Sequence, residues 1–348
     1  MRSFLFGLFL LLFPNTGMAQ LSPEIHARVE ASGLHGTYLL AREGRVLAQG
    51  SCGIADRERM LAFTGDEKFR IASITKAFTA VLVMQLVQEG RLELQAPIHR
   101  YLPWYAGQGG PTVTVEQLLT FSSGIPNCEG DQGMGVYQVL LPVDSFINHH
   151  CSGDLAFEPG SQFAYDNGAY ILLGRIIETV TGDTFSAELH RRILGPLGMR
   201  DTDLLRTEDV VPGLVTGYLL DSAGTWHRDP PYYIEQYGPA GALRSTPADL
   251  LRFDQALFTG QLLDAAQLQR LLTPFRHLWN VALGFWVVDR DFAGTSTRVA
   301  DRQGSIQGNN STWLHLIPEN ITVIVFSNTN ATDLTAVRDL LVEHALAH

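Results

Sequence analysis

The residues with the clearest chemical potential are Ser73 and Lys76, which lie three positions apart at the start of an apolar segment. Residues three apart share one face of a helix, so the hydroxyl and the amine would lie side by side. A lysine that is removed from water loses its proton more readily, and the neutral amine could then take the serine proton. Amide groups at a helix start would favour the negative charge that develops on Ser73. The pair therefore predicts a serine nucleophile for acyl transfer.

The segment that positions this pair is apolar on nearly every face from Ile74 to Leu86, and Gly90 supplies a stop for a helix. A helix that is hydrophobic all round has to be buried. An alternative interpretation is a core helix in which the Lys76 stem packs inside while its ammonium reaches water. Ser-x-x-Lys should occur by chance about once in a chain of this length, so other motifs are needed to distinguish the nucleophile from the core helix.

Targeting and charge restrict the class of protein. A positive start, an apolar run from Phe4 to Phe13 and small residues before position 20 predict a secretory signal peptide over residues 1–19. No later stretch reaches about 18 uninterrupted apolar residues, so no stable membrane span is expected and the predicted location is periplasmic or secreted. The net charge of -11, without a basic cluster, argues against a nucleic-acid partner.

The three cysteines, Cys52, Cys128 and Cys151, allow at most one intramolecular bridge. Cys128 and Cys151 both lie in loop-like sequence and could pair in an oxidising compartment. Connectivity cannot be deduced from a sequence, so this bridge stays open.

Strand-like sequence occurs at both ends of the chain, with mainly helical sequence between them. Residues 37–48 predict two short strands around a Glu43-Gly44 turn, and residues 283–289, 312–317 and 321–327 predict strands near the C-terminus. Helix starts are indicated at three places. These are Thr114 with Gln117, Thr246 with Pro247, and Thr332 or Asp333 before the last helix.

Two motifs resemble the serine β-lactamase and penicillin-binding protein superfamily, closest to its class C β-lactamase, D-aminopeptidase and esterase branch. Ser73-Ile74-Thr75-Lys76 resembles the nucleophile motif, and Tyr165-Asp166-Asn167 resembles the Tyr-x-Asn motif. Similar stretches follow the family order at residues 117–126, 157–160, 171–178, 195–199 and 240–246. The ordered set is specific, although each stretch alone is weak. Peptidases of the D-Ala-D-Ala carboxypeptidase type belong to the same group.

The resemblance implies a β-lactamase-like fold of the α/β plus all-α class. Both ends of the chain would build an antiparallel sheet flanked by helices, with a helical domain inserted between them. The α/β domain would comprise residues 20–76 and 278–348, and the mainly helical domain residues 77–277. The site would lie in the cleft between the two, with Ser73 at the junction.

The same resemblance implies a role for each motif residue. Ser73 would attack a carbonyl carbon, Lys76 and Tyr165 would share the proton transfer, and Asn167 would hold Lys76 and the substrate amide. The Lys76 ammonium would favour a phenolate or a polarised phenol at Tyr165. The alternative for Tyr165 and Asn167 is an ordinary helix-capping turn.

The third family motif departs from its usual form. Gly304 and Gly308 fit the family spacing, but Arg302 stands where Lys or His is expected. An arginine cannot relay a proton, but it can hold a substrate carboxylate through two hydrogen bonds. The backbone amides of Ser73 and Ser305 would form the oxyanion hole. The alternative for Arg302 is a solvent-facing charge on an edge strand.

These features predict an exported serine hydrolase that forms an acyl-enzyme at Ser73 on amide, peptide or β-lactam substrates. One rival is a family esterase, and another is a catalytically silent binder of cell-wall fragments. No Gly-x-Ser-x-Gly and no His-Glu-x-x-His occurs, so neither an α/β-hydrolase elbow nor that zinc motif is present. No cofactor or metal is expected. The partner would be a small-molecule or peptide substrate, and the oligomeric state stays open.

Overall fold

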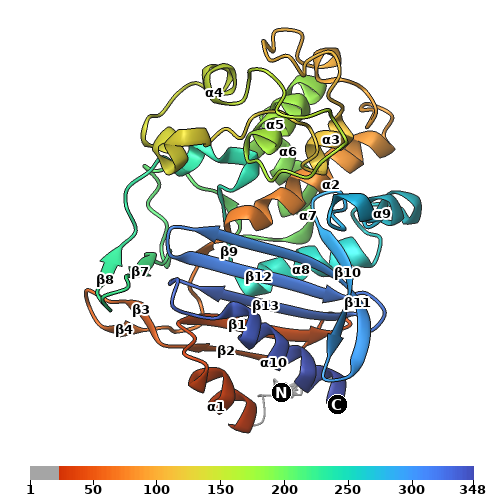
Figure 1. Ribbon diagram of the computed structural model, residues 1–348. Helices are drawn as coiled ribbons and strands as arrows, with labels where there is room; N and C mark the ends of the chain where they lie inside the picture. The colour runs from red at the N-terminus through yellow and green to blue at the C-terminus, as the bar shows by residue number, and fades with distance from the viewer. Residues whose placement is uncertain (1–22) are drawn as a thin grey trace, which may run out of the picture.

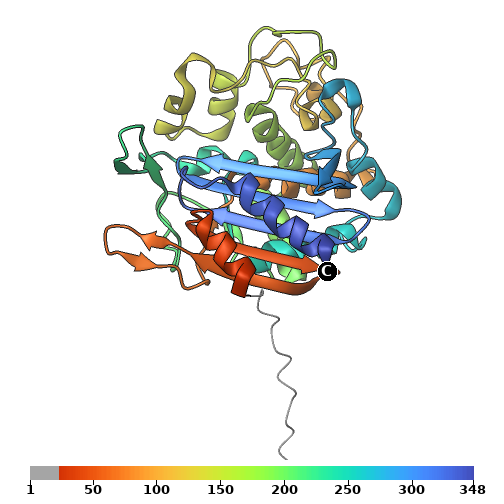
Figure 2. The same cartoon turned by 60° about the horizontal axis from the view of Figure 1, so that its bottom comes forward.

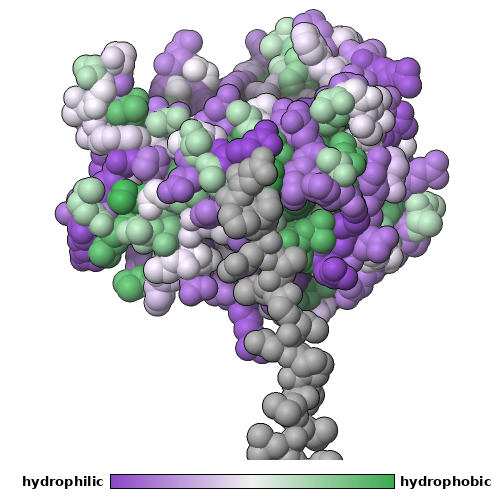
Figure 3. All heavy atoms as spheres, turned by 90° about the horizontal axis from the view of Figure 1, so that it is seen from below, coloured by the Kyte–Doolittle hydropathy of each residue, from purple (hydrophilic) through white to green (hydrophobic). Residues whose placement is uncertain are grey.

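The computed structural model describes residues 23–348 of the chain, so the predicted signal peptide lies outside the described residues. Within residues 23–348, no helix is both long enough and apolar enough to cross a membrane. Seen from below, hydrophilic and hydrophobic groups are interspersed over the surface (Figure 3).

A six-stranded antiparallel sheet takes strands from both ends of the chain, in the order β10-β11-β12-β13-β1-β2 (Figure 1). The strands are β1 (Gly36–Arg42), β2 (Arg45–Cys52), β10 (Trp286–Phe292), β11 (Thr295–Ile306), β12 (Asn309–Leu316) and β13 (Ile321–Ser327). Glu43 and Gly44 both have positive φ, which suits the two-residue turn of the β1–β2 hairpin. The predicted sheet from both chain ends, and with it the β-lactamase-like fold, is confirmed.

Helices cover both faces of this sheet (Figures 1 and 2). On one face, α1 (Pro23–Ala31) and α10 (Leu334–Ala347) pack on Val323 and Val325. On the other, α2 (Thr75–Gln88) and α8 (Pro247–Phe258) share a larger core with Ile324 and Phe326. Side chains alternate across a strand, so adjacent residues of β13 belong to opposite cores, and all seven of its residues are buried.

The middle of the chain forms a helical layer above the sheet (Figure 1). Its helices are α3 (Val115–Leu119), α4 (Val143–His150), α5 (Gly168–Thr181), α6 (Phe185–Leu189), α7 (Gly195–Leu197) and α9 (Ala265–Leu271), with a π-helical turn η4 (His190–Leu194). Short 3-10 turns are η1 (Ala72–Ile74), η2 (Ile98–Arg100), η3 (Gly130–Gln138), η5 (Ile234–Gln236), η6 (Gly238–Ala240) and η7 (Arg276–Leu278). Small strands are β3 (Ile54–Asp56), β4 (Leu61–Ala62), β5 (Phe69–Arg70), β6 (Asp203–Leu204), β7 (Tyr218–Leu220), β8 (Trp226–Arg228) and β9 (Leu243–Ser245).

The predicted helix starts are confirmed. Thr114 and Gln117 form a reciprocal capping box on α3, and Thr246 caps α8 with Pro247 at its first position. Of the two candidates for the last helix, Asp333 is the cap of α10. These caps satisfy backbone amides that a helix leaves without a partner.

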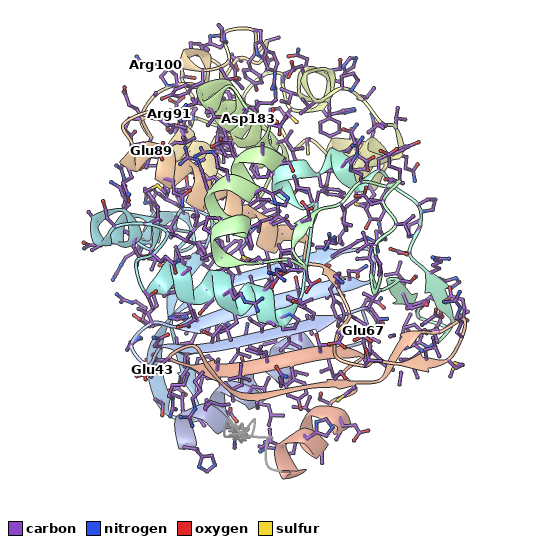
Figure 4. All side chains as sticks on the ribbon, turned by 180° about the vertical axis from the view of Figure 1, so that it is seen from behind. Glu43, Glu67, Glu89, Arg91, Arg100 and Asp183 are labelled. Atoms are coloured by element: carbon purple, nitrogen blue, oxygen red, sulfur yellow. The ribbon has the colours of Figure 1, made fainter. Side chains whose placement is uncertain are left out.

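The helix that follows Ser73 is buried along almost its whole length, as its composition predicted. It runs between the sheet and the helical layer, and Gly90 lies just beyond its end with φ 68°. Glu89, at the C-terminus of α2, forms an ion pair with Arg91 (Figure 4). It also accepts hydrogen bonds from Arg192, which ties this end of the helix to η4. The helix is therefore held by packing along its length and by charge at its end.

The thiols of Cys128 and Cys151 are both buried and both free. They are nevertheless neighbours, because the Cys151 thiol is hydrogen-bonded to Cys128. Burial, with this hydrogen bond, raises the pKa of Cys151 well above its usual range. The structure therefore places the two cysteines together without a disulfide between them.

Candidate active site

Ser73 lies in a tight turn that joins β5 to α2. The amide of Ile71 donates to the carbonyl of Leu243 on β9, which fixes the chain just before the nucleophile. Ala72 then adopts φ 46°, in the left-handed region that costs a non-glycine residue roughly 1–2 kcal/mol. Ala72 is buried and its neighbours are hydrogen-bonded, so the surrounding structure holds this conformation. The turn presents Ser73 within η1, with its hydroxyl toward Tyr165.

The three residues expected to move protons meet at one point. The Nζ of Lys76 donates to the Oγ of Ser73 at 3.1 Å, and the hydroxyl of Tyr165 donates to the same Oγ at 2.6 Å. Lys76 also donates to the Oδ1 of Asn167 at 2.6 Å and to the carbonyl of Ala240 at 2.7 Å. Three acceptors match the three donors of an ammonium, so the site is built to hold Lys76 in its protonated form next to Ser73.

The pKa values of this cluster follow from its burial and charge. Burial lowers the pKa of Lys76, which is 0% exposed, and the nearby positive charge of Arg302 acts in the same direction. Burial alone would raise the pKa of Tyr165, but the charges of Lys76 and Arg302 outweigh it and hold that pKa below its usual value. The ring of Tyr165 is partly exposed while its hydroxyl is enclosed by Ser73, Lys76 and Arg302, and the hydroxyl is what titrates. Tyr165 is therefore the better placed proton acceptor.

Asp166 fixes the two residues that flank it. Its carboxylate accepts the backbone amides of Cys128, Gly168 and Ala169 at 3.1, 2.9 and 2.8 Å. These contacts tie the start of α5 to the loop at Cys128. Tyr165 and Asn167 are thereby directed toward Ser73 and Lys76, so the predicted Tyr-x-Asn motif stands beside the Ser-x-x-Lys motif.

Arg302 lies under the nucleophile and not on the surface. It is 0% exposed, its Nε donates to the carbonyl of Ser73 at 2.8 Å, and its Nη2 donates to the hydroxyl of Tyr165 at 3.3 Å. The solvent-facing alternative is thus wrong. Its Nη1 makes no hydrogen bond to the described residues, and the side chain lines the same cavity as Ser73. Two nitrogens of the guanidinium, Nε and Nη2, therefore bond to the catalytic cluster, and Nη1 stays available to donate to a ligand.

Gly304 allows β11 to approach the nucleophile turn. A Cβ at this position would lie 2.3 Å from the carbonyl oxygen of Ile71 and 3.0 Å from the amide nitrogen of Ser73. Any side chain would push β11 away from η1. Ser305, the next residue, lines both cavities that open beside Ser73, where the resemblance places an oxyanion donor.

Two cavities meet at Ser73. The larger, of about 740 Å³, runs past Trp286 and Arg302 toward the start of α10. The smaller, of about 410 Å³, is bordered by the Tyr165-Asn167 segment and by Glu129. Both volumes suit a small molecule or a short peptide. Among residues 23–348, no group of three or more His, Cys, Asp or Glu side chains gathers as metal ligands.

The sequence interpretation missed two parts of the site. The ring of Phe121 stacks on Tyr165 at 4.6 Å between centroids and lies 5.8 Å from the Arg302 guanidinium carbon. Glu129 accepts a hydrogen bond from the Nδ2 of Asn167 at 2.7 Å. Aromatic residues and isolated carboxylates occur all along a chain, so no local sequence pattern distinguished Phe121 or Glu129 from the others. Glu129 does fall in the loop 122–135, and it borders the smaller cavity.

Several known proteins have sequences similar to this chain. A family model described as Beta-lactamase matches residues 24–347. Penicillin-binding protein 4* of Bacillus subtilis (strain 168) is 27% identical over 315 residues, which cover 84% of this chain and 68% of that protein. Esterase EstB of Burkholderia gladioli is 34% identical over 184 residues, which cover 49% of this chain and 47% of the esterase.

Solved structures share the fold. A D-stereospecific amidohydrolase from Streptomyces sp. superposes with a TM-score of 0.78 and 25% identity, covering 92% of this chain and 96% of that chain. The family match, over residues 24–347, spans both the sheet and the helical layer. The chain therefore belongs to the beta-lactamase family and is a serine hydrolase.

Proposed function

We propose that this hydrolase is exported and forms a covalent acyl-enzyme at Ser73 with amide, peptide or β-lactam substrates. The observation that carries the proposal is the convergence of Lys76 and Tyr165 on one oxygen, the Oγ of Ser73. Such a contact provides both a proton acceptor and a positive charge where the nucleophile is generated.

The proposed reaction has two halves. The phenolate of Tyr165, stabilised by the Lys76 ammonium, takes the proton of Ser73 while Oγ bonds to the substrate carbonyl carbon, and the amides of Ser73 and Ser305 stabilise the charge on the carbonyl oxygen. Collapse of the tetrahedral intermediate breaks the bond to the leaving group, which takes the proton from Tyr165. Water then attacks the ester carbonyl carbon and gives a proton to Tyr165. When this second tetrahedral intermediate collapses, the bond to Oγ breaks, Tyr165 returns the proton to Ser73, and the acid is released.

Amides are favoured over plain esters by the surroundings of the nucleophile. Asn167 lies against Lys76 at the cavity wall, where a side-chain amide can pair with a substrate amide. Solved relatives include the Streptomyces amidohydrolase and a D-amino acid amidase from Ochrobactrum anthropi. The similarity to EstB supports the alternative function, that of a family esterase. A silent cell-wall binder has no need of all four residues Ser73, Lys76, Tyr165 and Asn167.

The deciding experiment is mass spectrometry of the mature protein after exposure to a penicillin, a fluorophosphonate and a panel of D-amino-acid peptides. We expect a stoichiometric adduct on the peptide that contains Ser73. An adduct on another residue, or none with any probe, would contradict the proposal. Export is tested by determining the N-terminal sequence of the protein recovered from outside the cytoplasm. We expect it to begin after residue 19.

Replacing Arg302 tests whether its free donor capacity holds a substrate carboxylate. A charge-assisted hydrogen bond contributes about 1.5–3 kcal/mol, so Arg302→Ala should lower kcat/KM about 10- to 150-fold for a carboxylate substrate. At a pH above the rise in kcat/KM of both proteins, the methyl ester of that substrate should be affected much less. Arg302→Lys should recover part of the loss, because the charge survives without the planar fork. Equal losses for acid and ester would assign Arg302 to the catalytic cluster alone.

The pH profile tests the effect of Arg302 on Tyr165. A group that accepts a proton works only above its pKa, so kcat/KM on a neutral ester should rise with pH and level off. Arg302 holds the pKa of Tyr165 down, so Arg302→Ala should move this rise to higher pH. Arg302→Lys keeps the charge and should leave the rise near its original position. An unchanged profile in Arg302→Ala would show that Tyr165 is not the group observed.

A further inference from the structure

Cys128 and Cys151 meet at the start of α5. Their thiols are hydrogen-bonded to each other, so the two side chains already point together, as a disulfide requires. A Cβ on Gly168, the first residue of α5, would lie 2.9 Å from the sulfur of Cys151 and 3.2 Å from the Cβ of Cys128. Both cysteines therefore pack on the same bare backbone, and glycine at this position leaves room for the two sulfurs.

The third cysteine of the chain belongs to a different part of the fold. Cys52 ends β2 and packs with α1 and α10 in the core on one face of the sheet. Cys128 and Cys151 belong to the core on the other face. The sheet lies between the two cores, so Cys128 and Cys151 are the pair that can join within one molecule.

The backbone at both cysteines is tied to its surroundings by hydrogen bonds. The amide of Cys128 donates to Asp166, the carboxylate that directs the Tyr-x-Asn motif toward Ser73. Cys151 follows the last residue of α4, and its carbonyl accepts a hydrogen bond from the hydroxyl of Tyr105 at 2.7 Å. A bond between the two sulfurs would therefore join the loop that holds the motif to the anchored end of α4.

We propose that Cys128 and Cys151 form a disulfide when the protein folds outside the cytoplasm, and that this bond fixes the Tyr-x-Asn motif beside Ser73. The inference rests on the proposed export, because exported chains reach an oxidising compartment whereas cytosolic thiols are kept reduced. The structure with free thiols then corresponds to the reduced form, in which the pair is in place but not joined.

The oxidant is another disulfide, represented experimentally by oxidised glutathione. The thiolate of one cysteine attacks it, releases one glutathione thiol and forms a mixed disulfide, and the thiolate of the other cysteine then displaces the second glutathione thiol. Two protons and two electrons leave the chain, and the oxidant is reduced to two thiols. Both cysteines are buried in the folded protein, and burial raises the pKa of Cys151. The exchange therefore takes place in the folding chain, before α5 packs over the sulfurs.

The bond is tested on the protein recovered from outside the cytoplasm and on mature protein refolded with oxidised glutathione. Each is compared with the same protein kept in a thiol reductant. The oxidised protein should be lighter by about 2 Da, and after denaturation it should titrate with the single thiol of Cys52. A digest without reductant should contain the two peptides of Cys128 and Cys151 joined. Three reactive thiols after oxidation, or a bond to Cys52, would overturn the inference.

The reduced and oxidised forms should differ in stability and in the reactivity of Ser73. A bond from residue 128 to residue 151 restricts the unfolded chain, so the reduced form should melt about 5–10 °C lower. Labelling of Ser73 by a fluorophosphonate should be several-fold slower in the reduced form, because small displacements of catalytic groups slow acyl transfer. Equal labelling rates would overturn the link between the bond and the motif.

Cys52→Ala is the matched control, because it removes another buried thiol from the opposite core. It should lose the same mass on oxidation and keep the difference between the two forms. Cys151→Ala cannot form the bond, so its oxidised and reduced samples should melt and label alike. Each variant is compared with itself, so a change in its basal stability does not affect the result. A redox effect that persists in Cys151→Ala would overturn the inference.

Export and bond formation can fail separately. Exported protein that lacks residues 1–19 but has three alkylated thiols would overturn the disulfide and leave the acyl-enzyme proposal intact. Protein that remains in the cytoplasm with residues 1–19, but forms the bond with oxidised glutathione, would overturn the export and support the pairing of Cys128 with Cys151.

Discussion

Ser73→Ala is expected to abolish covalent labelling and turnover while leaving the fold intact. The change removes one oxygen from a partly buried side chain, so no cavity of methyl size is created in the core. Lys76 keeps its contacts with Asn167 and Ala240, so its ammonium is not left without acceptors. The melting temperature should stay within a few degrees of the wild-type value.

The measurement is intact-mass spectrometry with the fluorophosphonate, together with melting curves of both proteins. The matched control is Ser305→Ala, which changes another serine at the same cavity but keeps the backbone amide. That variant should still be labelled. Labelling of Ser73→Ala at the wild-type stoichiometry would mean that another residue is the nucleophile.

Lys76→Ala and Tyr165→Phe are each expected to slow turnover about 10²- to 10⁴-fold, the range usual for loss of a proton-transfer group. Tyr165→Phe removes one hydroxyl and keeps the ring that stacks on Phe121, so its stability should change little. Lys76→Ala removes a buried cation that satisfies Asn167 and the carbonyl of Ala240, so some loss of stability should accompany the kinetic effect.

The two residues act on one oxygen, so the double variant should lose much less than the product of the single losses. Single-turnover kinetics with a chromogenic ester would report acylation and deacylation separately. Activity within threefold of wild type in both single variants would mean that a different base serves Ser73.

Local signals in the sequence predicted the elements whose ends are capped or whose composition is uniform. Gly90 and the apolar run indicated α2, and Thr332 or Asp333 indicated the start of α10, where Asp333 is the cap. The strand predicted from residue 283 begins at Trp286 instead, because Gly284 has φ 86° and the amide of Ala282 bonds to Phe285 in a turn. A strand pattern cannot distinguish a short apolar turn from the strand that follows it.

The site was predictable where its residues form short motifs, and less so where it depends on distant contacts. Ser73 with Lys76, and Tyr165 with Asn167, are each local patterns. The burial of Arg302 was not predictable, since it depends on η1 and β11 meeting across Gly304. The position of Glu129 depends in the same way on Asn167 and Tyr137, which belong to different segments.

The sheet that joins both ends of the chain also determines when the enzyme can become active. Arg302 and the Ser73 carbonyl are separated by 229 residues, and Gly36 pairs with Ser327 across a still longer stretch. Contacts of such long sequence separation form slowly, because the loop must close before they stabilise it. A growing chain therefore has no complete nucleophile site until β11 to β13 have been synthesised. We therefore expect the unfinished chain to lack hydrolase activity. The edge of β1 that pairs with β13 stays unpaired until β13 has been synthesised.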